Sequence, residues 1–165
     1  METRKTFHPV ILGIGCAALA LGVVVYLISR PAEDVYFIHR SPVPISLYSL
    51  IPDVFGGIAY HLPSFLHVFA FSMITAGLVS RSKQAILLIC GGWFSVDFLF
   101  ELGQKYGDGI VAYIPRWFEH VPFLENSAGF FVSGTFDMYD VAATALGAVS
   151  AYLLLSMMKE KGDRK

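Results

Sequence analysis

Three polar side chains occupy successive turns of one otherwise apolar stretch of the chain. Asp97 and Glu101 are four residues apart, and Gln104 follows three residues later. Spacings of three and four residues place side chains on one face of a helix. Carboxylates held together in this way can exchange protons with a substrate or bind a cation. We therefore expect one helix face to carry all three groups toward a common site.

Two further apolar stretches carry the remaining candidates. His67 lies in one of them, and Asp137 and Asp140 begin the other, on the same helix face as Thr144. Charged groups inside a membrane usually face the interior of a helix bundle. Four carboxylates in a medium of low dielectric cannot all stay ionised, so protons or a cation must balance them. The predicted polar pocket consists of His67, Asp97, Glu101, Gln104, Asp137 and Asp140, with no catalytic residue assigned among them.

Structural explanations exist for the same residues. Asp137 can cap the N-terminus of a helix, with Asp140 in its first turn, where the helix dipole favours negative charge. Glu101 can end a helix at the water interface. A polar residue inside a span, such as Asp97 or His67, can join two helices by a hydrogen bond. The sequence leaves these explanations and a binding role open.

We predict neither a metal site nor a cofactor. His61 and His67 are six residues apart, which does not place them on one helical face. Cys16 and Cys90 have no metal-binding spacing. A metal site formed by His67, Glu101 and an aspartate is the remaining alternative.

Composition identifies the elements that must position these groups. Of the 165 residues, 55% are hydrophobic and 15% are charged, whereas soluble domains carry about 25% charged residues. A net charge of −1 also gives no basic surface for nucleic acid. We therefore predict a single membrane domain over residues 1–165, with no nucleic-acid partner.

Four apolar segments are long enough to cross a bilayer, which takes about 20 residues of helix. They are residues 10–29, 62–80, 84–103 and 138–158. The first is longer than the apolar region of a signal peptide and lacks an A-x-A cleavage site, so we expect it to be retained. The predicted fold is an all-α membrane protein, a four-transmembrane-helix bundle with long extracytoplasmic loops that contain interfacial segments.

Basic residues predict the orientation of this bundle. The two termini and the turn at residues 80–83 carry eight of the 12 Lys and Arg residues, and the opposite side carries four. The positive-inside rule then places both termini in the cytoplasm. All six residues of the predicted polar pocket fall in the extracytoplasmic half.

Two long connections lie on the extracytoplasmic side. Residues 45–60 are mostly apolar but contain Pro52, Gly56 and Gly57, which disfavour an ordinary span. An interfacial or re-entrant segment is the preferred interpretation, and a fifth crossing is the alternative. Residues 105–136 are rich in Tyr, Trp and Phe, which favour the headgroup zone. We expect this connection to lie on the outer membrane surface and to contain short helices.

Three short motifs resemble those of VanZ-like membrane proteins, in the same order and spacing. They are the His-containing run at residues 61–71, the E-x-x-Q at 101–104 and the G-x-x-D-x-x-D helix start at 134–147. Thr135 and Thr144 depart from the Arg and Asn that the family often has there. The resemblance implies a multi-pass protein of the bacterial cytoplasmic membrane. It implies no catalytic mechanism, because none comes with the family.

The functional prediction is a non-enzymatic envelope protein that uses its polar pocket to bind another molecule. The expected partners are a membrane lipid, a lipid-linked envelope substrate such as a glycan, or another membrane protein. A small intramembrane enzyme acting on a lipid or polyprenyl-linked substrate is the first alternative, with Glu101 or Asp140 as general base and His67 as acid or metal ligand. An ion or proton pathway is the second, although the cytoplasmic halves of the helices are nearly all apolar.

Overall fold

The computed structural model describes residues 7–32, 35, 46–79, 82–122 and 124–163. Within these ranges the chain is helical and has no strand, which confirms the all-α prediction. The elements are α1 (Pro9–Ser29), η2 (Gly56–Tyr60), α3 (Leu62–Leu78), α4 (Lys83–Lys105), α5 (Gly107–Val111), η3 (Arg116–His120), α6 (Ser127–Ser133) and α7 (Met138–Asp163).

Local signals in the sequence set the ends of the long helices. Helix α1 begins at Pro9 and ends at Ser29, because Arg30 precedes a proline and adopts an extended backbone. Helix α4 begins after Ser82, whose hydroxyl accepts a hydrogen bond of 3.0 Å from the backbone N–H of Ala85. Helix α7 begins at Met138, as predicted, and continues to Asp163, five residues beyond the predicted end.

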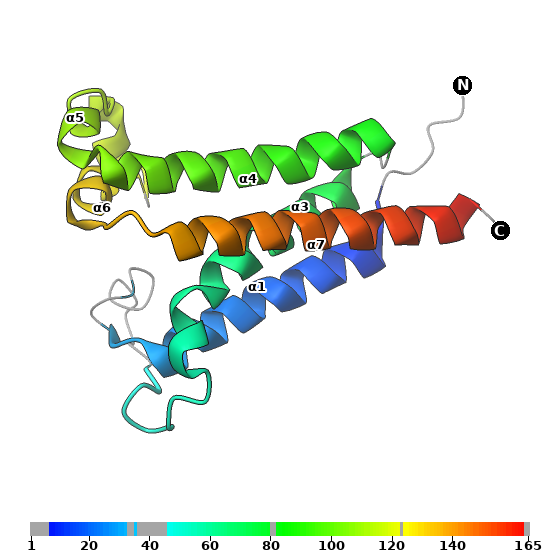
Figure 1. The fold of residues 1–165 in the computed structure, drawn as a ribbon, viewed down its shortest axis with the longest axis horizontal. Helices are drawn as coiled ribbons and strands as arrows, with labels where there is room; N and C mark the ends of the chain where they lie inside the picture. Colours follow the sequence, from blue (N-terminus) through cyan, green and yellow to red (C-terminus); the bar gives the residue numbers. More distant parts are fainter. Residues whose placement is uncertain (1–6, 33–34, 36–45, 80–81, 123, 164–165) are drawn as a thin grey trace.

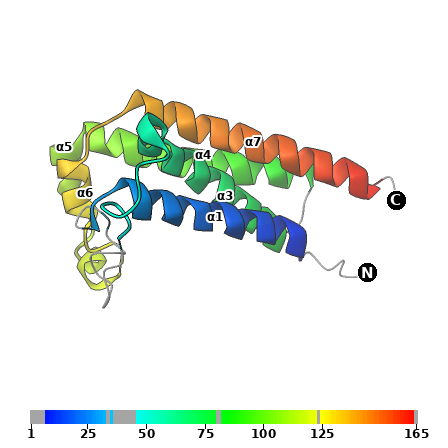
Figure 2. The same ribbon diagram turned by 90° about the horizontal axis from the view of Figure 1, so that it is seen from below.

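Helix α3 is the central element of the fold. It packs against α1, α4 and α7, and the four long helices lie side by side with both chain termini at one end (Figures 1 and 2). The opposite end, which we call the distal end, carries α5 and α6 (Figure 1). The chain therefore runs toward the distal end in α1 and α4 and away from it in α3 and α7.

Glycines allow the helices to approach α3 closely. A methyl group added at Gly15 of α1 would meet the backbone of Ala70 and Ile74 in α3. A methyl group added at Gly147 of α7 would collide with the carbonyl oxygen of Phe65, also in α3. Because lipid gives helices little hydrophobic reason to associate, close backbone contact of this kind is a main source of their attraction.

Apolar packing fills the half of the structure nearer the termini. The buried core there consists of Ile11, Met73, Ala76, Ile86, Cys90, Ala151 and Leu155. A smaller cluster of Val25, Ala59 and Leu66 lies toward the distal end. Both cysteines are free; Cys90 belongs to the core, whereas Cys16 is exposed on α1.

Three of the four predicted spans are long and apolar enough to cross a membrane. They are α1, α4 and the part of α7 from Met138 to Lys159. Helix α3 has 17 residues and a length of about 25 Å, whereas the hydrocarbon core is about 30 Å thick. It stops at Leu78 because Val79 is extended, so the span predicted over 62–80 is shorter than expected. The fourth span remains a prediction.

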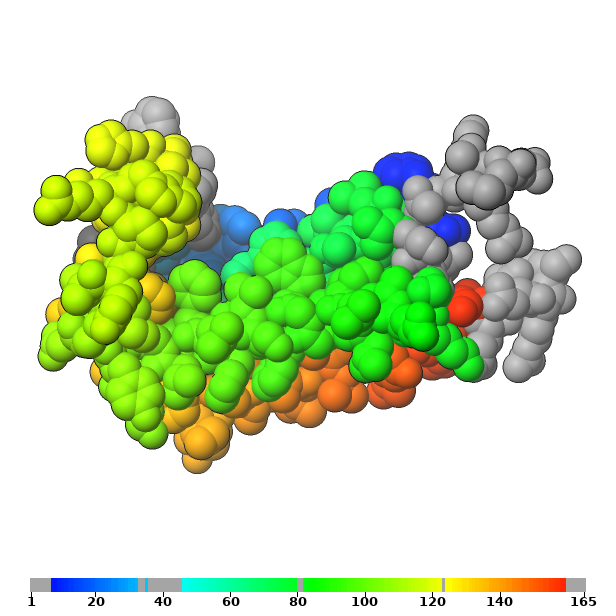
Figure 3. All heavy atoms as spheres, turned by 90° about the horizontal axis from the view of Figure 1, so that it is seen from above, coloured from blue at the N-terminus to red at the C-terminus, as the bar shows by residue number. Residues whose placement is uncertain are grey.

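Where the structure describes them, the two long connections contain only short helical elements. Within residues 46–61 the longest is η2, so the described part of the 45–60 segment has no helix long enough for a fifth crossing; residue 45 lies outside the described residues. Between α4 and α7 the chain forms α5, η3 and α6, which confirms the expected short helices. Figure 3 shows part of this connection, in yellow-green and yellow, projecting from the distal end. Its exposed aromatic residues include Tyr106, Tyr113 and Trp117.

Candidate functional site

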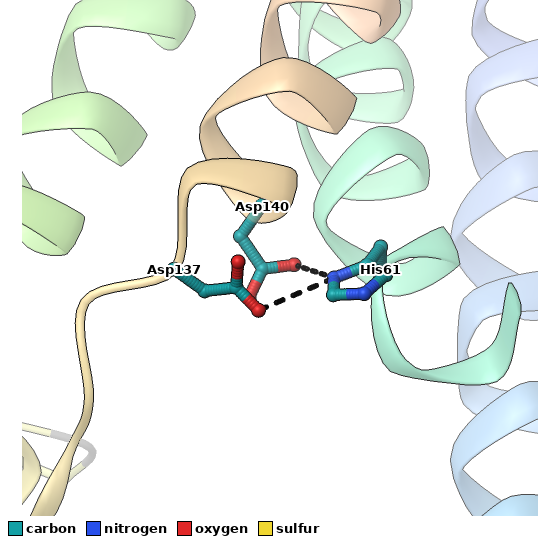
Figure 4. A group of neighbouring side chains, drawn as sticks. All are labelled: His61, Asp137 and Asp140. Carbon is teal, nitrogen blue, oxygen red and sulfur yellow. Dashed lines mark hydrogen bonds and ion pairs between the residues drawn. The ribbon is translucent and has the colours of Figure 1, made fainter. Parts of the chain in front are cut away.

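His61 and the two aspartates of α7 converge at the distal end (Figure 4). The Nδ1 atom of His61 lies 3.1 Å from Oδ1 of Asp140 and 3.8 Å from Oδ2 of Asp137. His61 immediately precedes α3, and the aspartates stand at and just after the start of α7. The convergence therefore depends on the packing of α3 against α7.

The two carboxylate oxygens of Asp137 have different environments. Oδ1 accepts a hydrogen bond of 2.8 Å from the backbone N–H of Tyr139, which confirms Asp137 as the N-cap of α7. Oδ2 faces His61. The backbone N–H of Asp137 in turn donates to Oε2 of Glu101 at 3.4 Å. Capping thus uses one oxygen and leaves the other directed into the site.

Ser64 orients the second aspartate. Its hydroxyl donates a hydrogen bond of 2.8 Å to Oδ1 of Asp140, the same oxygen that faces His61. Ser64 is three residues after His61, so both groups reach α7 from one face of α3. We call His61, Glu101, Asp137 and Asp140 the distal polar cluster.

The distal polar cluster is partly accessible. The exposed fractions of the His61, Asp137 and Asp140 side chains are 32%, 37% and 21%. The charges of Asp97, Asp137 and Asp140 all act on the Glu101 carboxyl. A group of negative charges that is open at the surface but partly shielded from water attracts cations.

His67 and Asp97 form a separate pair between α3 and α4. His67 Nδ1 lies 3.5 Å from Asp97 Oδ2, with exposed fractions of 51% and 15% for the two side chains. Asp97 is about 6 Å deeper along α4 than Glu101, which separates the pair from the distal polar cluster.

Aromatic contacts extend this connection between the helices. The His67 ring packs on Phe71, which stacks on Trp93 with ring centroids 4.7 Å apart. Trp93 Nε1 donates a hydrogen bond of 3.0 Å to the hydroxyl of Thr75. The geometry therefore fits the structural interpretation, in which His67 and Asp97 join two helices.

The predicted polar pocket thus divides into three parts. Glu101, Asp137 and Asp140 come together, and His67 and Asp97 pair with each other. Gln104 packs against Gly134, where an added methyl group would lie 2.7 Å from the amide carbon of the glutamine.

Two members of the site, His61 and Ser64, lie outside the predicted polar pocket. His61 shares no helical face with His67, but it precedes Ser64 by three residues. The spacing of three residues between them was the available signal.

Arg30 lies beside this region. Its guanidinium carbon lies 5.0 Å from the centre of the Tyr26 ring, and its Nη2 donates to the carbonyl oxygen of Tyr60, the residue before His61. Arg116, in the connection between α4 and α7, lies in η3 and is exposed.

Three residues of the distal polar cluster could hold a metal ion. His61, Asp137 and Asp140 each offer one ligand atom, and these atoms all lie within 4.8 Å of one another. The prediction of no metal site, which considered the spacing of the histidines and of the cysteines, did not consider this combination of residues and stays a prediction.

The chain matches no protein-family model, no curated protein and no solved structure. The resemblance to VanZ-like proteins therefore stays a prediction, and the functional argument rests on the geometry of the site.

Proposed function

We propose that the chain is a VanZ-like, multi-pass membrane protein that binds an envelope lipid or a lipid-linked molecule through the distal polar cluster. The observation that carries this proposal is the gathering of half-buried polar side chains from α3, α4 and α7 at one end of the helices. Exposed aromatic residues of the α4–α7 connection lie at the same end. A lipid headgroup occupies this zone of a membrane, where tyrosine and tryptophan are favourable.

The proposal includes a fourth membrane crossing by α3. Helix α1 ends at the distal end and α4 begins at the other, so the chain between them must return along the whole bundle (Figure 1). Helix α3 is shielded from lipid by its contacts with α1, α4 and α7, so its 17 residues are enough for a membrane crossing at this central position. Both termini are then on one side, which the distribution of Lys and Arg assigns to the cytoplasm.

Labelling of single cysteines tests this topology. In a chain carrying Cys16→Ala and Cys90→Ala, we expect the Asp108→Cys variant to react with a membrane-impermeant maleimide in intact cells. The Ser82→Cys variant should react only after lysis, because the α3–α4 turn is cytoplasmic in this arrangement. Labelling of both positions in intact cells would contradict the four-crossing topology.

An ion pathway is disfavoured by the core near the termini. Ile11, Met73, Ile86 and Leu155 are almost completely buried against one another there. The buried side chains of this core cluster are apolar apart from the Cys90 thiol, and a chain of ionisable groups that could relay a proton does not continue through it.

One observation supports the enzymatic alternative. When His61 carries its proton on Nδ1, it donates to Asp140 and leaves Nε2 as an acceptor. A histidine oriented by a carboxylate in this way is the usual general base of hydrolytic sites. The described residues place no serine, threonine or cysteine hydroxyl or thiol in hydrogen-bond contact with that nitrogen, so water would have to be the nucleophile.

Mass spectrometry of lipids that copurify with the protein tests the binding proposal. We expect the wild-type chain to retain a specific lipid or lipid-linked species. The Glu101→Gln and Asp140→Asn variants should lose it, because each removes a charge from the distal polar cluster. Asp108→Asn, which neutralises an exposed carboxylate of α5, is the matched control and should retain it.

Whole-membrane lipid profiles from the same strains separate binding from catalysis. A changed ratio of a substrate and its product in the Asp140→Asn strain would favour the enzyme. Identical copurifying lipids in all four proteins would refute the binding proposal.

A further inference from the structure

We infer that His61, Asp137 and Asp140 form a binding site for a divalent transition-metal ion of the Zn²⁺ type. The site is carried by two helices that are far apart in the sequence and packed together in the fold. It supplies one imidazole nitrogen and two carboxylate oxygens, a mixture typical of Zn²⁺, Fe²⁺ and Mn²⁺ sites in proteins.

The separations of the ligand atoms fit a tetrahedral ion. Zinc bonds of about 2.0–2.2 Å place neighbouring ligands roughly 3.3–3.6 Å apart. The two separations from His61 Nδ1, 3.1 Å to Asp140 and 3.8 Å to Asp137, lie on either side of this range. Both carboxylates are partly exposed, so an ion can reach them from the surface.

The surroundings hold the ligands in place. Ser64 donates to Asp140, and the backbone of α7 donates to the non-ligating oxygen of Asp137. Hydrogen bonds of this kind fix the orientation of metal ligands and raise their affinity for the ion. Three protein ligands leave a fourth position on a tetrahedral ion for water or an exogenous ligand.

The His67–Asp97 pair lacks these properties. It offers two ligand atoms, 3.5 Å apart, and among the described residues no third His, Cys, Asp or Glu completes a group with them. The chain therefore contains a matched control, a second histidine–aspartate pair between the same group of packed helices.

A bound ion also explains how an acidic site accommodates a phosphate-bearing headgroup, a consequence that rests on the proposed function. Carboxylates repel phosphate, whereas a divalent ion with a free coordination position binds phosphate oxygen directly. Metal binding itself is measurable without any lipid, so the two proposals can fail independently.

Titration of Zn²⁺ into the full chain in detergent, measured by isothermal titration calorimetry, tests the inference. We expect one Zn²⁺ ion per chain for the wild type. His61→Asn should weaken binding by more than about 100-fold because it removes a ligand, and Ser64→Ala by about 10-fold because it loosens one. His67→Asn should bind as the wild type does. Wild-type binding no stronger than that of His61→Asn would overturn the inference.

A gain of signal excludes loss of folding as the cause. In the His61→Cys variant the new thiolate can ligate Co²⁺, which produces a sulfur-to-cobalt charge-transfer absorption. Neither the wild type, with Cys16 and Cys90, nor the His67→Cys variant should show this absorption. Its absence from His61→Cys, or its equal presence in His67→Cys, would refute the site.

Discussion

The close contact between α1 and α3 at Gly15 provides the most direct test of how the helices are held together. A methyl group added there would lie 2.8 Å from Cγ1 of Ile74 and 2.9 Å from both the carbonyl oxygen of Ala70 and the backbone nitrogen of Ile74. Two of these three atoms belong to the backbone of α3 and cannot rotate away. Gly13, two residues earlier on the same helix, has no atom within 4 Å of an added methyl group.

The expected magnitudes follow from these distances. Optimal separations between non-bonded carbon atoms begin at about 3.5 Å, so the two backbone atoms at Gly15 are roughly 0.6 Å too close. Overpacking of this size typically costs about 1–3 kcal/mol. Both substitutions gain the same helix propensity, up to about 1 kcal/mol, so this gain cancels in the comparison, and at Gly13 there is no steric cost. We predict that Gly15→Ala is less stable than Gly13→Ala by about 2 kcal/mol.

Unfolding of the two variants by SDS titration, followed through tryptophan fluorescence, measures this difference. A difference of about 2 kcal/mol corresponds to roughly a 30-fold change in the unfolding equilibrium constant. Equal stability of the two variants would show that α1 does not depend on this contact for its packing on α3.

Three further predictions concern single contacts. A double-mutant cycle of Trp93→Phe and Thr75→Val should give a coupling energy of about 0.6 kcal/mol, the average for a hydrogen bond between helices in a membrane, and zero coupling would contradict the contact. The hydrogen bond from Ser29 holds the pKa of Asp53 below its ordinary value, so Ser29→Ala should raise that pKa in an NMR titration. The stabilisation by this depressed pKa is complete above the unfolded-state pKa and disappears as the pH falls through the folded-state pKa; an unchanged titration would refute it. Gly147→Ala should separate α7 from α3 and weaken Zn²⁺ binding in calorimetry, and wild-type affinity would argue against that packing.

The long helices were predictable because hydropathy and capping act locally. Residues 10–29 and 84–103 were predicted as spans, and the helices are Pro9–Ser29 and Lys83–Lys105. The start predicted near residue 138 is also correct, because Asp137 caps the helix with its own side chain. The length of α3 was overestimated because the apolar composition continues beyond the point at which the backbone becomes extended.

The composition of the site was harder to predict because it depends on contacts between helices. Spacing along one helix correctly groups Asp137 with Asp140, but it also groups Asp97 with Glu101, which take different partners. His61 lies about 9 Å along the axis of α3 from His67. The two histidines do not share a helical face, so their spacing gives no reason to place them in one site. The position of His61 beside Asp140 follows from the packing of α7 on α3, which no short-range pattern encodes.

Capping alone does not account for the acids at the start of α7. Serine, threonine and asparagine cap helices about as well as aspartate, so a cap does not require a negative charge at position 137. Only Oδ1 of Asp137 serves the cap, while Oδ2 faces His61. The Asp140 side chain makes no capping hydrogen bond. Its Oδ1 accepts a hydrogen bond from Ser64 and lies beside Nδ1 of His61. The helix dipole favours a negative charge in the first turn, but it does not call for a serine and a histidine beside one carboxylate oxygen, which is the arrangement that a cation site needs.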